Sequence, residues 1–409
     1  MTTAPKGRRQ QQGAASEESG DTASDAGLHL PSLSITGFRG IDELHIPRLG
    51  RVTLIVGDNG VGKSTVLEAV RLYASRGDSL AITDILADRE EFSAFYNADG
   101  DVQGDIHWPR IFHSEGRDRT NRIAISTLPQ AEDGSGLVIE TVDLAEDSPE
   151  VIRRKREMGV GDFRGTFFAQ MVSYGDKQWR LSIPDLVPHV ASWTPLEESG
   201  PENIFDVHAE VPPIKWHLIE PNLPNNEDIA RDWQENRRID PLYSSRRIVE
   251  GVIKSIAGVD LDRVGLSVYK DDSGKEKSHV VAVTKDDPLG RPLKSLGEGA
   301  YRLLVLALAL NKSIDGFLLI DEAENGIHYS RHEDYWRILI EIAVEYNIQV
   351  LATTHSYDCI RGFARAISSK EDGTGMLIRL DKDENGTLTA AGYTHELLQI
   401  MDELSLEVR

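Results

Sequence analysis

The chain has 409 residues, of which 40% are hydrophobic and 27% are charged, and its formal net charge is −22. This composition is typical of a soluble globular protein long enough for two or three domains, and the acidic excess argues against a broad nucleic-acid-binding face, which needs basic side chains. A single cysteine, Cys359, excludes a disulfide framework, and no apolar run is long enough to span a bilayer, so we expect a cytoplasmic protein without membrane contact.

The N-terminal part divides into a polar tail and the beginning of a folded lobe. Residues 1–27 carry almost no large apolar side chain and are predicted to be disordered. Residues 28–46 predict two short strands that turn at residues 37–40, and residues 52–56 are apolar and β-branched, as expected of a buried strand. We expect this N-terminal lobe to cover residues 28–100.

A glycine-rich loop follows this buried strand and leads into a helical apolar pattern. Its sequence, GDNGVGKS, matches the GxxxxGK[ST] phosphate-binding loop (Walker A) in the required setting between a strand and a helix. The glycines let backbone N–H groups surround phosphates, Lys63 is placed to reach the β- and γ-phosphates, and the Ser64 hydroxyl is placed to bind Mg²⁺. The predicted nucleotide-binding residues of the loop are Gly57, Asn59, Gly60, Gly62, Lys63, Ser64 and Thr65.

A region of weaker patterns, residues 101–258, follows a second predicted helix at residues 79–96. Short β-like runs between Gly, Asp and Ser loops predict an inserted antiparallel β region, and residues 225–257 predict a helical part. Residues 150–158 predict a short charged helix, whose basic cluster is either a solvated face or a phosphate contact on DNA, RNA or a partner. The β-like runs are residues 105–112, 122–128, 137–142 and 178–183.

The C-terminal lobe, residues 259–409, shows more regular patterns. It begins with a predicted hairpin at residues 264–284, alternates buried strands with helices, and closes with a second hairpin and a helix. Such alternation around a phosphate-binding loop predicts an α/β P-loop NTPase with a mixed, mainly parallel sheet, an antiparallel β subdomain and the inserted region. The predicted strands are residues 316–321, 348–353, 376–380 and 388–392, and the predicted helices are residues 300–311, 330–346, 356–367 and 394–404.

Two acidic residues and one histidine follow the buried strands of this lobe. Asp321 ends the apolar run FLLI and suits Mg²⁺, while the adjacent Glu322 is placed to activate an attacking water as general base. His355 follows the next strand, and the carboxyl ends of such strands meet at one crevice, so we expect His355 near the γ-phosphate. Together with the loop, these residues predict binding and hydrolysis of ATP with Mg²⁺, although no base-recognition motif separates ATP from GTP.

A second glycine-flanked turn, Ser295-Leu296-Gly297-Glu298-Gly299, also enters a helix and is a second potential phosphate site. Within one chain this second phosphate site has no evident function, because the P-loop already binds the phosphates. Ser295, Gly297 and Gly299 are therefore predicted to contact the nucleotide of a second subunit, and the alternative is an ordinary helix N-terminus.

In their order along the chain, these motifs resemble those of the ABC-type ATPase heads of the SMC/RecF group, and within it the OLD-like (overcoming lysogenization defect) bacterial ATPases. The segments that carry the resemblance are the Walker A loop, SLGEGAYRLL, LLIDEAENGIHYS and VLATTHSYDC. The resemblance implies a homodimer that sandwiches two ATP molecules, a D-loop across the dimer, and a nucleotide contact by Arg39. The implied D-loop residues are Glu324, Asn325, Gly326 and His328.

The chain departs from the family pattern at two places. Too few residues follow the last motif for the TOPRIM nuclease domain of full-length OLD proteins, so the resemblance implies an ATPase that regulates a separately encoded effector, such as a TOPRIM-type nuclease in phage defence. The Q-loop glutamine of ABC heads is not identified, and the candidates are Gln103, Gln130, Gln170, Gln178 and the segment at residues 111–113.

Two other functions stay open on the sequence alone. One is a RecF-like DNA-repair ATPase that binds DNA directly, against which the acidic charge and the lack of a sustained heptad pattern argue. The other is a nucleotide sensor that dimerises on ATP without hydrolysing it.

Overall fold

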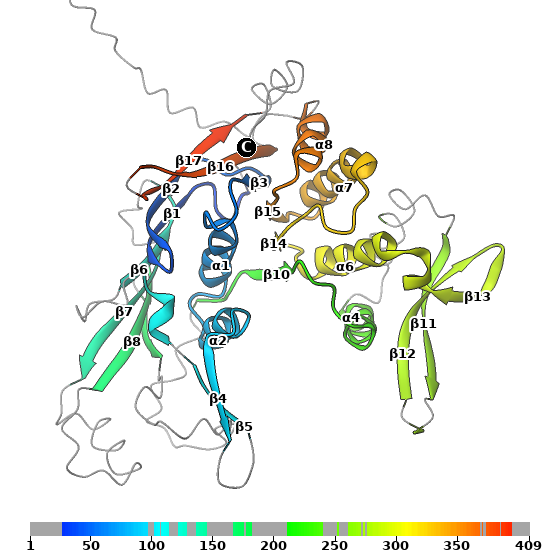
Figure 1. The fold of residues 1–409 in the computed structure, drawn as a ribbon, viewed down its shortest axis with the longest axis horizontal. Coiled ribbons are helices and arrows are strands. Elements are labelled where there is room, and N and C mark those ends of the chain that lie inside the picture. Colours follow the sequence, from blue (N-terminus) through cyan, green and yellow to red (C-terminus); the bar gives the residue numbers. More distant parts are fainter. Residues whose placement is uncertain are drawn as a thin grey trace, which may run out of the picture.

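The computed structural model describes residues 27–96, 102–106, 108–113, 122–128, 136–144, 167–175, 177–181, 211–239, 252, 261–270, 273–274, 276–368, 370, 374–384 and 386–394. They form two six-stranded sheets and two small sheets, with helices between and beside them (Figure 1). Three predicted segments lie wholly or almost wholly outside these residues: the tail at residues 1–27, the charged helix at residues 150–158 and the last helix at residues 394–404.

The central sheet carries the predicted site residues at one edge. Its strand order is β10-β14-β15-β3-β16-β17, with all strands parallel except the last. Because β14, β15 and β3 are neighbours, the loops that follow their carboxyl ends lie side by side. The predicted mixed, mainly parallel α/β fold is thus confirmed. The strands are β10 (Lys215–Ile219), β14 (Gly316–Ile320), β15 (Gln349–Thr353), β3 (Val52–Val56), β16 (Gly375–Lys382) and β17 (Leu388–Tyr393).

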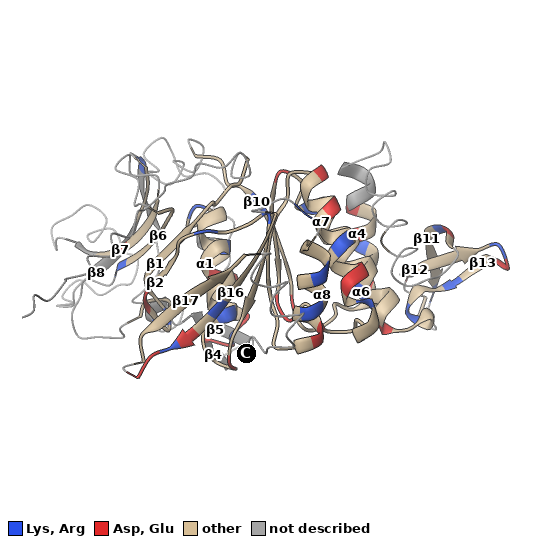
Figure 2. Cartoon of the chain, turned by 90° about the horizontal axis from the view of Figure 1, so that it is seen from above, with Lys and Arg blue, Asp and Glu red and all other residues tan. Residues whose placement is uncertain are grey.

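Side chains of the central strands alternate between two hydrophobic cores. In β3, Leu54 packs into the core beside α6, α7 and α8, whereas Ile55 packs into the core beside α1 and α2. This double cover explains why the parallel strands are apolar along their whole length. Figures 1 and 2 show the helices on the two sides of the sheet. They are α1 (Lys63–Ala74), α2 (Ser79–Ala87), α6 (Glu298–Lys312), α7 (His332–Glu345) and α8 (Tyr357–Ile367).

The second six-stranded sheet is antiparallel and has the order β2-β1-β6-β7-β8-β9. The predicted N-terminal hairpin is present as β1 and β2, and β6 pairs directly with β1, so strands of the predicted inserted region extend this hairpin. Helix α1 lies between this sheet and the central sheet (Figure 1). The strands are β1 (Leu33–Phe38), β2 (Ile41–Ile46), β6 (Arg122–Ser126), β7 (Leu137–Leu144), β8 (Phe167–Tyr174) and β9 (Lys177–Leu181).

Two predicted elements differ from the structure. The predicted helix at residues 79–96 is wrong after α2, because Glu90 has a left-handed φ of 56° and β4 (Phe92–Tyr96) pairs with β5 (Val102–Ile106). The aromatic sequence FSAFY favours a strand over a helix. The predicted strand at residues 105–112 is wrong after β5, because residues 108–111 form the short helix η1, and its proline cannot donate to a strand ladder.

Strand β10 was not predicted, although it is an edge strand of the central sheet. Its sequence, KWHLI, is short and has no long apolar run, and its parallel pairing with β14 joins residues far apart in the chain. The helix expected at residues 225–257 is described only as α4 (Asn226–Ile239) and at residue 252.

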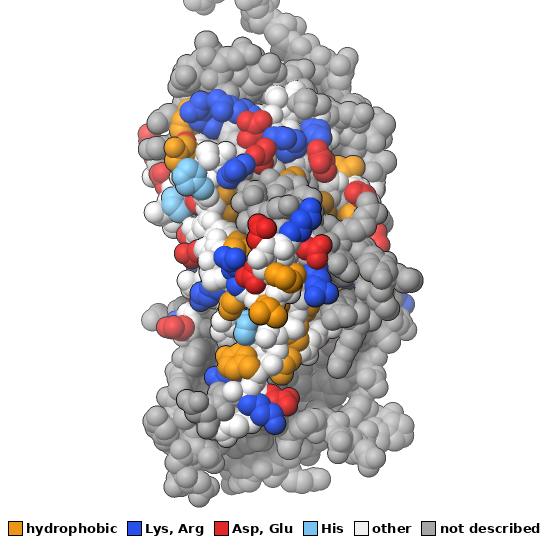
Figure 3. All heavy atoms as spheres, turned by 90° about the vertical axis from the view of Figure 1, so that its right-hand side faces the viewer, with side chains coloured by type: hydrophobic (Ala, Val, Ile, Leu, Met, Phe, Trp, Pro, Cys, Tyr) orange, Lys and Arg blue, Asp and Glu red, His pale blue; other side chains and the backbone are white. Residues whose placement is uncertain are grey.

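A three-stranded sheet forms the far end of the described structure (Figure 1). β11 (Leu261–Lys270) and β12 (Glu276–Thr284) confirm the predicted hairpin, and β13 (Asp287–Pro292) adds a strand that was not predicted. Figure 3 shows apolar and charged side chains mixed on this end, where Leu289 is 93% exposed. Among the described residues, no helix is long and apolar enough to cross a membrane.

Trp336 provides a test of the core beside α7. Its ring is fully buried, its Nε1–H donates to the Cys359 carbonyl oxygen at 3.1 Å, and it packs edge to face with Phe363. We expect Trp336→Ala to lower the free energy of unfolding by about 3–5 kcal/mol, measured by chemical denaturation. Val344→Ala on the exposed side of the same helix is the control, and equal losses in both variants would contradict this packing.

Candidate functional site

A cavity of about 370 Å³ lies where the loops after β3, β14 and β15 meet. The structure brings together here the residues that were predicted for phosphate, metal and catalysis in one subunit, except Arg39 and Gly57, of which Gly57 lines an adjoining cavity of about 300 Å³. The lining residues are Asn59, Gly60, Gly62, Lys63, Ser64, Thr65, Arg89, Asp321, Glu322, Thr353, Thr354 and His355.

The backbone of the phosphate-binding loop requires glycine. Gly57 has a φ of 143°, and a Cβ there would lie 2.4 Å from the carbonyl oxygen of Leu380 in β16. Gly62 has a φ of 123° and precedes α1, whose N-terminus is capped by no described side chain. The first N–H groups of α1 are therefore available to an anion, and the helix dipole favours negative charge at this end.

Lys63 lies folded against its own loop. Its Nζ donates hydrogen bonds to the carbonyl oxygens of Gly57 at 2.8 Å and Asp58 at 3.0 Å. Burial lowers the pKa of Lys63, while the negative charges of Asp321 and Glu324 oppose that shift. Among the described residues, the hydrogen-bond partners of this ammonium group are backbone carbonyl oxygens, which the oxygens of a bound phosphate can replace with a charge-assisted interaction.

Asp321 connects the loop with the ends of two strands. The Ser64 hydroxyl donates to Asp321 Oδ2 at 2.8 Å, and the Thr353 hydroxyl donates to Asp321 Oδ1. A hydroxyl and a carboxylate at this distance fit Mg²⁺, which usually takes one or two carboxylates and completes its shell with phosphate oxygens and water. No group of three or more His, Cys, Asp or Glu that could hold a metal occurs among the described residues.

Glu322 and His355 face the same cavity and are both held by the loop after β14. Glu322 has a left-handed φ of 52°, and its Oε2 accepts a hydrogen bond from Asn325 Nδ2 at 2.7 Å. His355 Nδ1 lies 2.9 Å from Glu324 Oε1. A left-handed backbone in a residue other than glycine is uncommon and is typical of functional sites.

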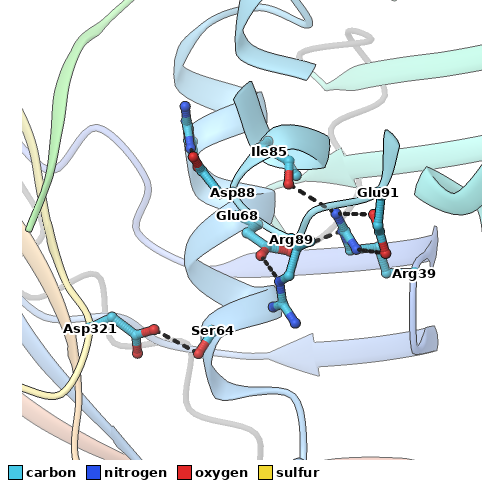
Figure 4. A network of polar contacts seen from close by, with 9 residues as sticks. Arg39, Ser64, Glu68, Ile85, Asp88, Arg89, Glu91 and Asp321 are labelled. Atoms are coloured by element: carbon cyan, nitrogen blue, oxygen red, sulfur yellow. Dashed lines mark hydrogen bonds and ion pairs between the residues drawn. The ribbon is translucent and has the colours of Figure 1, made fainter. Parts of the chain in front are cut away.

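Arg39 does not line the cavity. Its guanidinium is buried between Glu68, at 3.1 Å, and Glu91, at 2.9 Å, and it also donates to the Ile85 carbonyl oxygen (Figure 4). Burial raises the pKa of Glu68, while the charges of Arg39 and Arg89 oppose that shift. Arg39 thus joins the N-terminal hairpin to α1 and to the turn after α2.

Arg89 lines the cavity and was missed by the sequence analysis. Its Nε donates to Glu68 Oε1 at 2.8 Å, so Glu68 holds Arg39 and Arg89 at the same time (Figure 4). The side chain of Arg89 is 41% exposed, against 9% for Arg39. Nothing around Arg89 in the sequence signals this role, because the arginine reaches the cavity only through the packing of α2 against α1.

The turn at residues 295–299 lies outside the cavity of its own chain. It follows β13 through the short helix η3 (Leu293–Leu296), and Gly297, with a φ of 103°, begins α6. A Cβ at Gly299 would lie 3.0 Å from the carbonyl oxygen of Gly326 in the loop after β14. Ser295, Gly297 and Gly299 are thus not brought to the residues of the P-loop within one chain.

The family described as "AAA domain, putative AbiEii toxin, Type IV TA system" matches residues 52–358, which include every residue that lines the cavity. "Uncharacterized protein MJECL11" of Methanocaldococcus jannaschii is 31% identical over 114 residues, 28% of this chain and 99% of that protein.

Two solved structures are similar over most of the chain. An SmcHead bound to the C-winged helix domain of ScpA is 13% identical, with a TM-score of 0.43, over 91% of this chain and 99% of that chain. The Smc head domain with an extended coiled coil, bound to the C-terminal domain of ScpA derived from Pyrococcus furiosus, is 11% identical, with a TM-score of 0.46, over 92% and 99%.

The two arginines predict different effects of mutation. Arg39→Ala leaves two buried carboxylates without their shared cation, so we expect a loss of about 3–5 kcal/mol in the free energy of unfolding. Arg89→Ala removes an exposed ion pair, so we expect a loss below about 1 kcal/mol but at least about tenfold weaker ATP binding. Denaturation and equilibrium ATP titration measure the two effects, and weaker binding in a fully stable Arg39→Ala would contradict the assignment.

Proposed function

We propose, since the chain belongs to this AAA-domain family, that its cavity binds ATP with Mg²⁺ and hydrolyses the γ-phosphate. The observation that carries the proposal is the convergence of Lys63, Ser64, Asp321, Glu322 and His355 on one cavity at the carboxyl edge of the central sheet. This donor set supplies a phosphate cradle, oxygen ligands for a metal, a carboxylate base and an imidazole, which are the parts that phosphoryl transfer to water requires.

Binding begins at the phosphate-binding loop. The N–H groups at the start of α1 bind the phosphate oxygens, and Lys63 exchanges its carbonyl partners for the β- and γ-phosphates. Ser64 and Asp321 would hold Mg²⁺, which when bound neutralises charge that develops on the phosphates. Arg89 is the arginine that lines the cavity, so we assign it, in place of Arg39, the additional phosphate contact.

Hydrolysis uses the two residues beyond the metal ligand. The Glu322 carboxylate accepts a proton from the attacking water, which strengthens the water as a nucleophile. His355 hydrogen-bonds a γ-phosphate oxygen or holds the attacking water, and either contact stabilises the transition state. The Thr353 hydroxyl donates to the Asp321 carboxylate and accepts the backbone N–H of Glu322 at 2.9 Å. One side chain therefore positions both acidic residues.

The second nucleotide contact belongs to another copy of the chain. The glycine-flanked helix start at residues 295–299 is outside the cavity, yet it has the geometry of a phosphate-binding helix start. We therefore propose a homodimer with two ATP molecules, each between the P-loop of one subunit and Ser295, Gly297 and Gly299 of its partner.

The output of ATP turnover is assigned to a separate effector protein. The OLD-like resemblance of the motifs supports a separately encoded effector in phage defence, such as a TOPRIM-type nuclease. The family description names a putative toxin of a Type IV toxin–antitoxin system and no partner. Direct DNA contact has no support from the net charge of −22.

Two variants separate binding from hydrolysis. Lys63→Ala removes the phosphate cation, so we expect loss of ATP binding by equilibrium titration. Glu322→Gln keeps the shape of the side chain but removes the base, so we expect ATP binding to persist while kcat falls by about 10²- to 10⁴-fold in a phosphate-release assay. Glu333→Gln, an exposed change in the first turn of α7, is the control. Unchanged turnover in Glu322→Gln would exclude this residue as the base.

The dimer has its own test. With ATP and Mg²⁺, Glu322→Gln should double in mass by size exclusion with light scattering, because the nucleotide is bound but not consumed. The double variant Glu322→Gln with Ser295→Arg should stay monomeric. It should still bind ATP in the titration, because residue 295 lies outside the cavity of its own chain. A mass that ATP does not change would contradict the shared site.

A further inference from the structure

We infer that Glu324 and Asn325 are positioning residues for hydrolysis: Glu324 orients His355, and Asn325 orients Glu322. The inference rests on the proposed ATPase function and names the side chains that set its geometry. The two residues are adjacent in the loop after β14, and each contacts one of the two side chains assigned to the chemical step. One short loop thus fixes both the base and the imidazole.

One carboxylate oxygen of Glu324 contacts two nitrogen atoms of His355. Its Oε1 lies 2.9 Å from His355 Nδ1 and accepts the His355 backbone N–H at 3.1 Å. A carboxylate only accepts hydrogen bonds, so this contact favours the neutral imidazole that carries its proton on Nδ1. Nε2 is then the atom left for the cavity, and it donates to a phosphate only when the imidazole is protonated or accepts from a water when it is neutral. The carboxylate therefore sets both the direction of the ring and which nitrogen faces the ligand.

Asn325 restrains the base in a similar way. Its Nδ2 donates to Glu322 Oε2 at 2.7 Å, and its backbone N–H donates to the Glu322 carbonyl oxygen at 3.0 Å. With Oε2 occupied, Oε1 is the carboxylate oxygen that remains for a water. Because Glu322 has a left-handed φ, the two contacts also hold the backbone conformation that points this side chain to the cavity.

Residues of β15 and α6 hold the loop after β14. Ala323 N–H donates to the Thr353 carbonyl oxygen at 2.9 Å, and Arg302 packs against Gly326, where a Cβ would lie 3.5 Å from the arginine side chain. The Glu324 side chain is only 10% exposed, whereas that of His355 is 52% exposed. The carboxylate is thus more buried than the imidazole, and it is not among the residues that line the cavity.

Kinetics of two substitutions at each position test this assignment. We expect Glu324→Ala to lower kcat about 10- to 100-fold with unchanged ATP affinity, as for other supporting residues of active sites. Glu324→Gln should recover part of kcat, because its amide oxygen still accepts from Nδ1–H and from the backbone N–H. Asn325→Ala and Asn325→Asp should both lower kcat, and Asn325→Asp should lower it more because its carboxylate repels that of Glu322. Glu333→Ala is the control, and full kcat in Glu324→Ala would overturn the inference.

The histidine tautomer tests the same contact without any turnover. In protein labelled with ¹⁵N-histidine at about pH 8, where an ordinary imidazole is neutral, His355 should give the Nδ1–H tautomer, with His355→Gln used to assign its signal. The signal should change to a tautomer mixture in Glu324→Ala and stay in Glu324→Gln. An Nε2–H tautomer in the wild-type chain would overturn the positioning role even if ATP is hydrolysed. Absence of wild-type turnover would instead contradict the proposed function, and the tautomer would still decide the Glu324 contact.

Discussion

The hydrogen bonds of Asp321 depend on the whole central sheet. Its carboxylate accepts from Ser64 after β3 and from Thr353 at the end of β15, and its backbone N–H donates to the Ile219 carbonyl oxygen of β10 at 2.9 Å. One residue therefore joins four neighbouring strand ends. Because side chains alternate along a strand, a register shift of one residue between β14 and β15 would turn this carboxylate away from the loop. The two hydrophobic cores that fix the register thus also fix the site.

A site residue was predictable from the sequence where neighbouring residues in the chain determine its place. The phosphate-binding loop, Asp321 and His355 follow apolar strands directly, so pattern and position were sufficient to place them on one sheet edge. Strand β10 and Arg89 were missed because their places depend on pairing with distant residues, β14 for the strand and Glu68 for the arginine. The break after α2 was missed for a different reason: the left-handed Glu90 is not a residue type that marks a helix end.

Two buried arginines explain why the turn with Arg89 has a fixed place. Arg71 of α1 binds both Asp84 of α2 and Asp88 just after this helix, and its guanidinium stacks on the Trp216 ring of β10 with 4.7 Å to the centroid. Arg39 adds a second link, through Glu68 of α1 and Glu91 just before β4. A buried guanidinium contributes little net stability through its ion pairs, but it penalises every arrangement that leaves its charge without a carboxylate. The network therefore specifies the position of the turn relative to the P-loop helix.

At Glu322, hydrogen bonds offset the strain of a left-handed backbone. A left-handed φ in a residue other than glycine costs about 1–3 kcal/mol, and a net hydrogen bond contributes about 0.5–1.5 kcal/mol. The backbone N–H of Glu322 donates to Thr353, and its carbonyl and carboxylate oxygens accept from Asn325, so three hydrogen bonds are enough to offset the strain. Loss of either neighbour would remove part of this compensation for the strained backbone of Glu322. The position of the base is consequently a property of the loop and of β15 together, and the strand that carries Asp321 does not determine it alone.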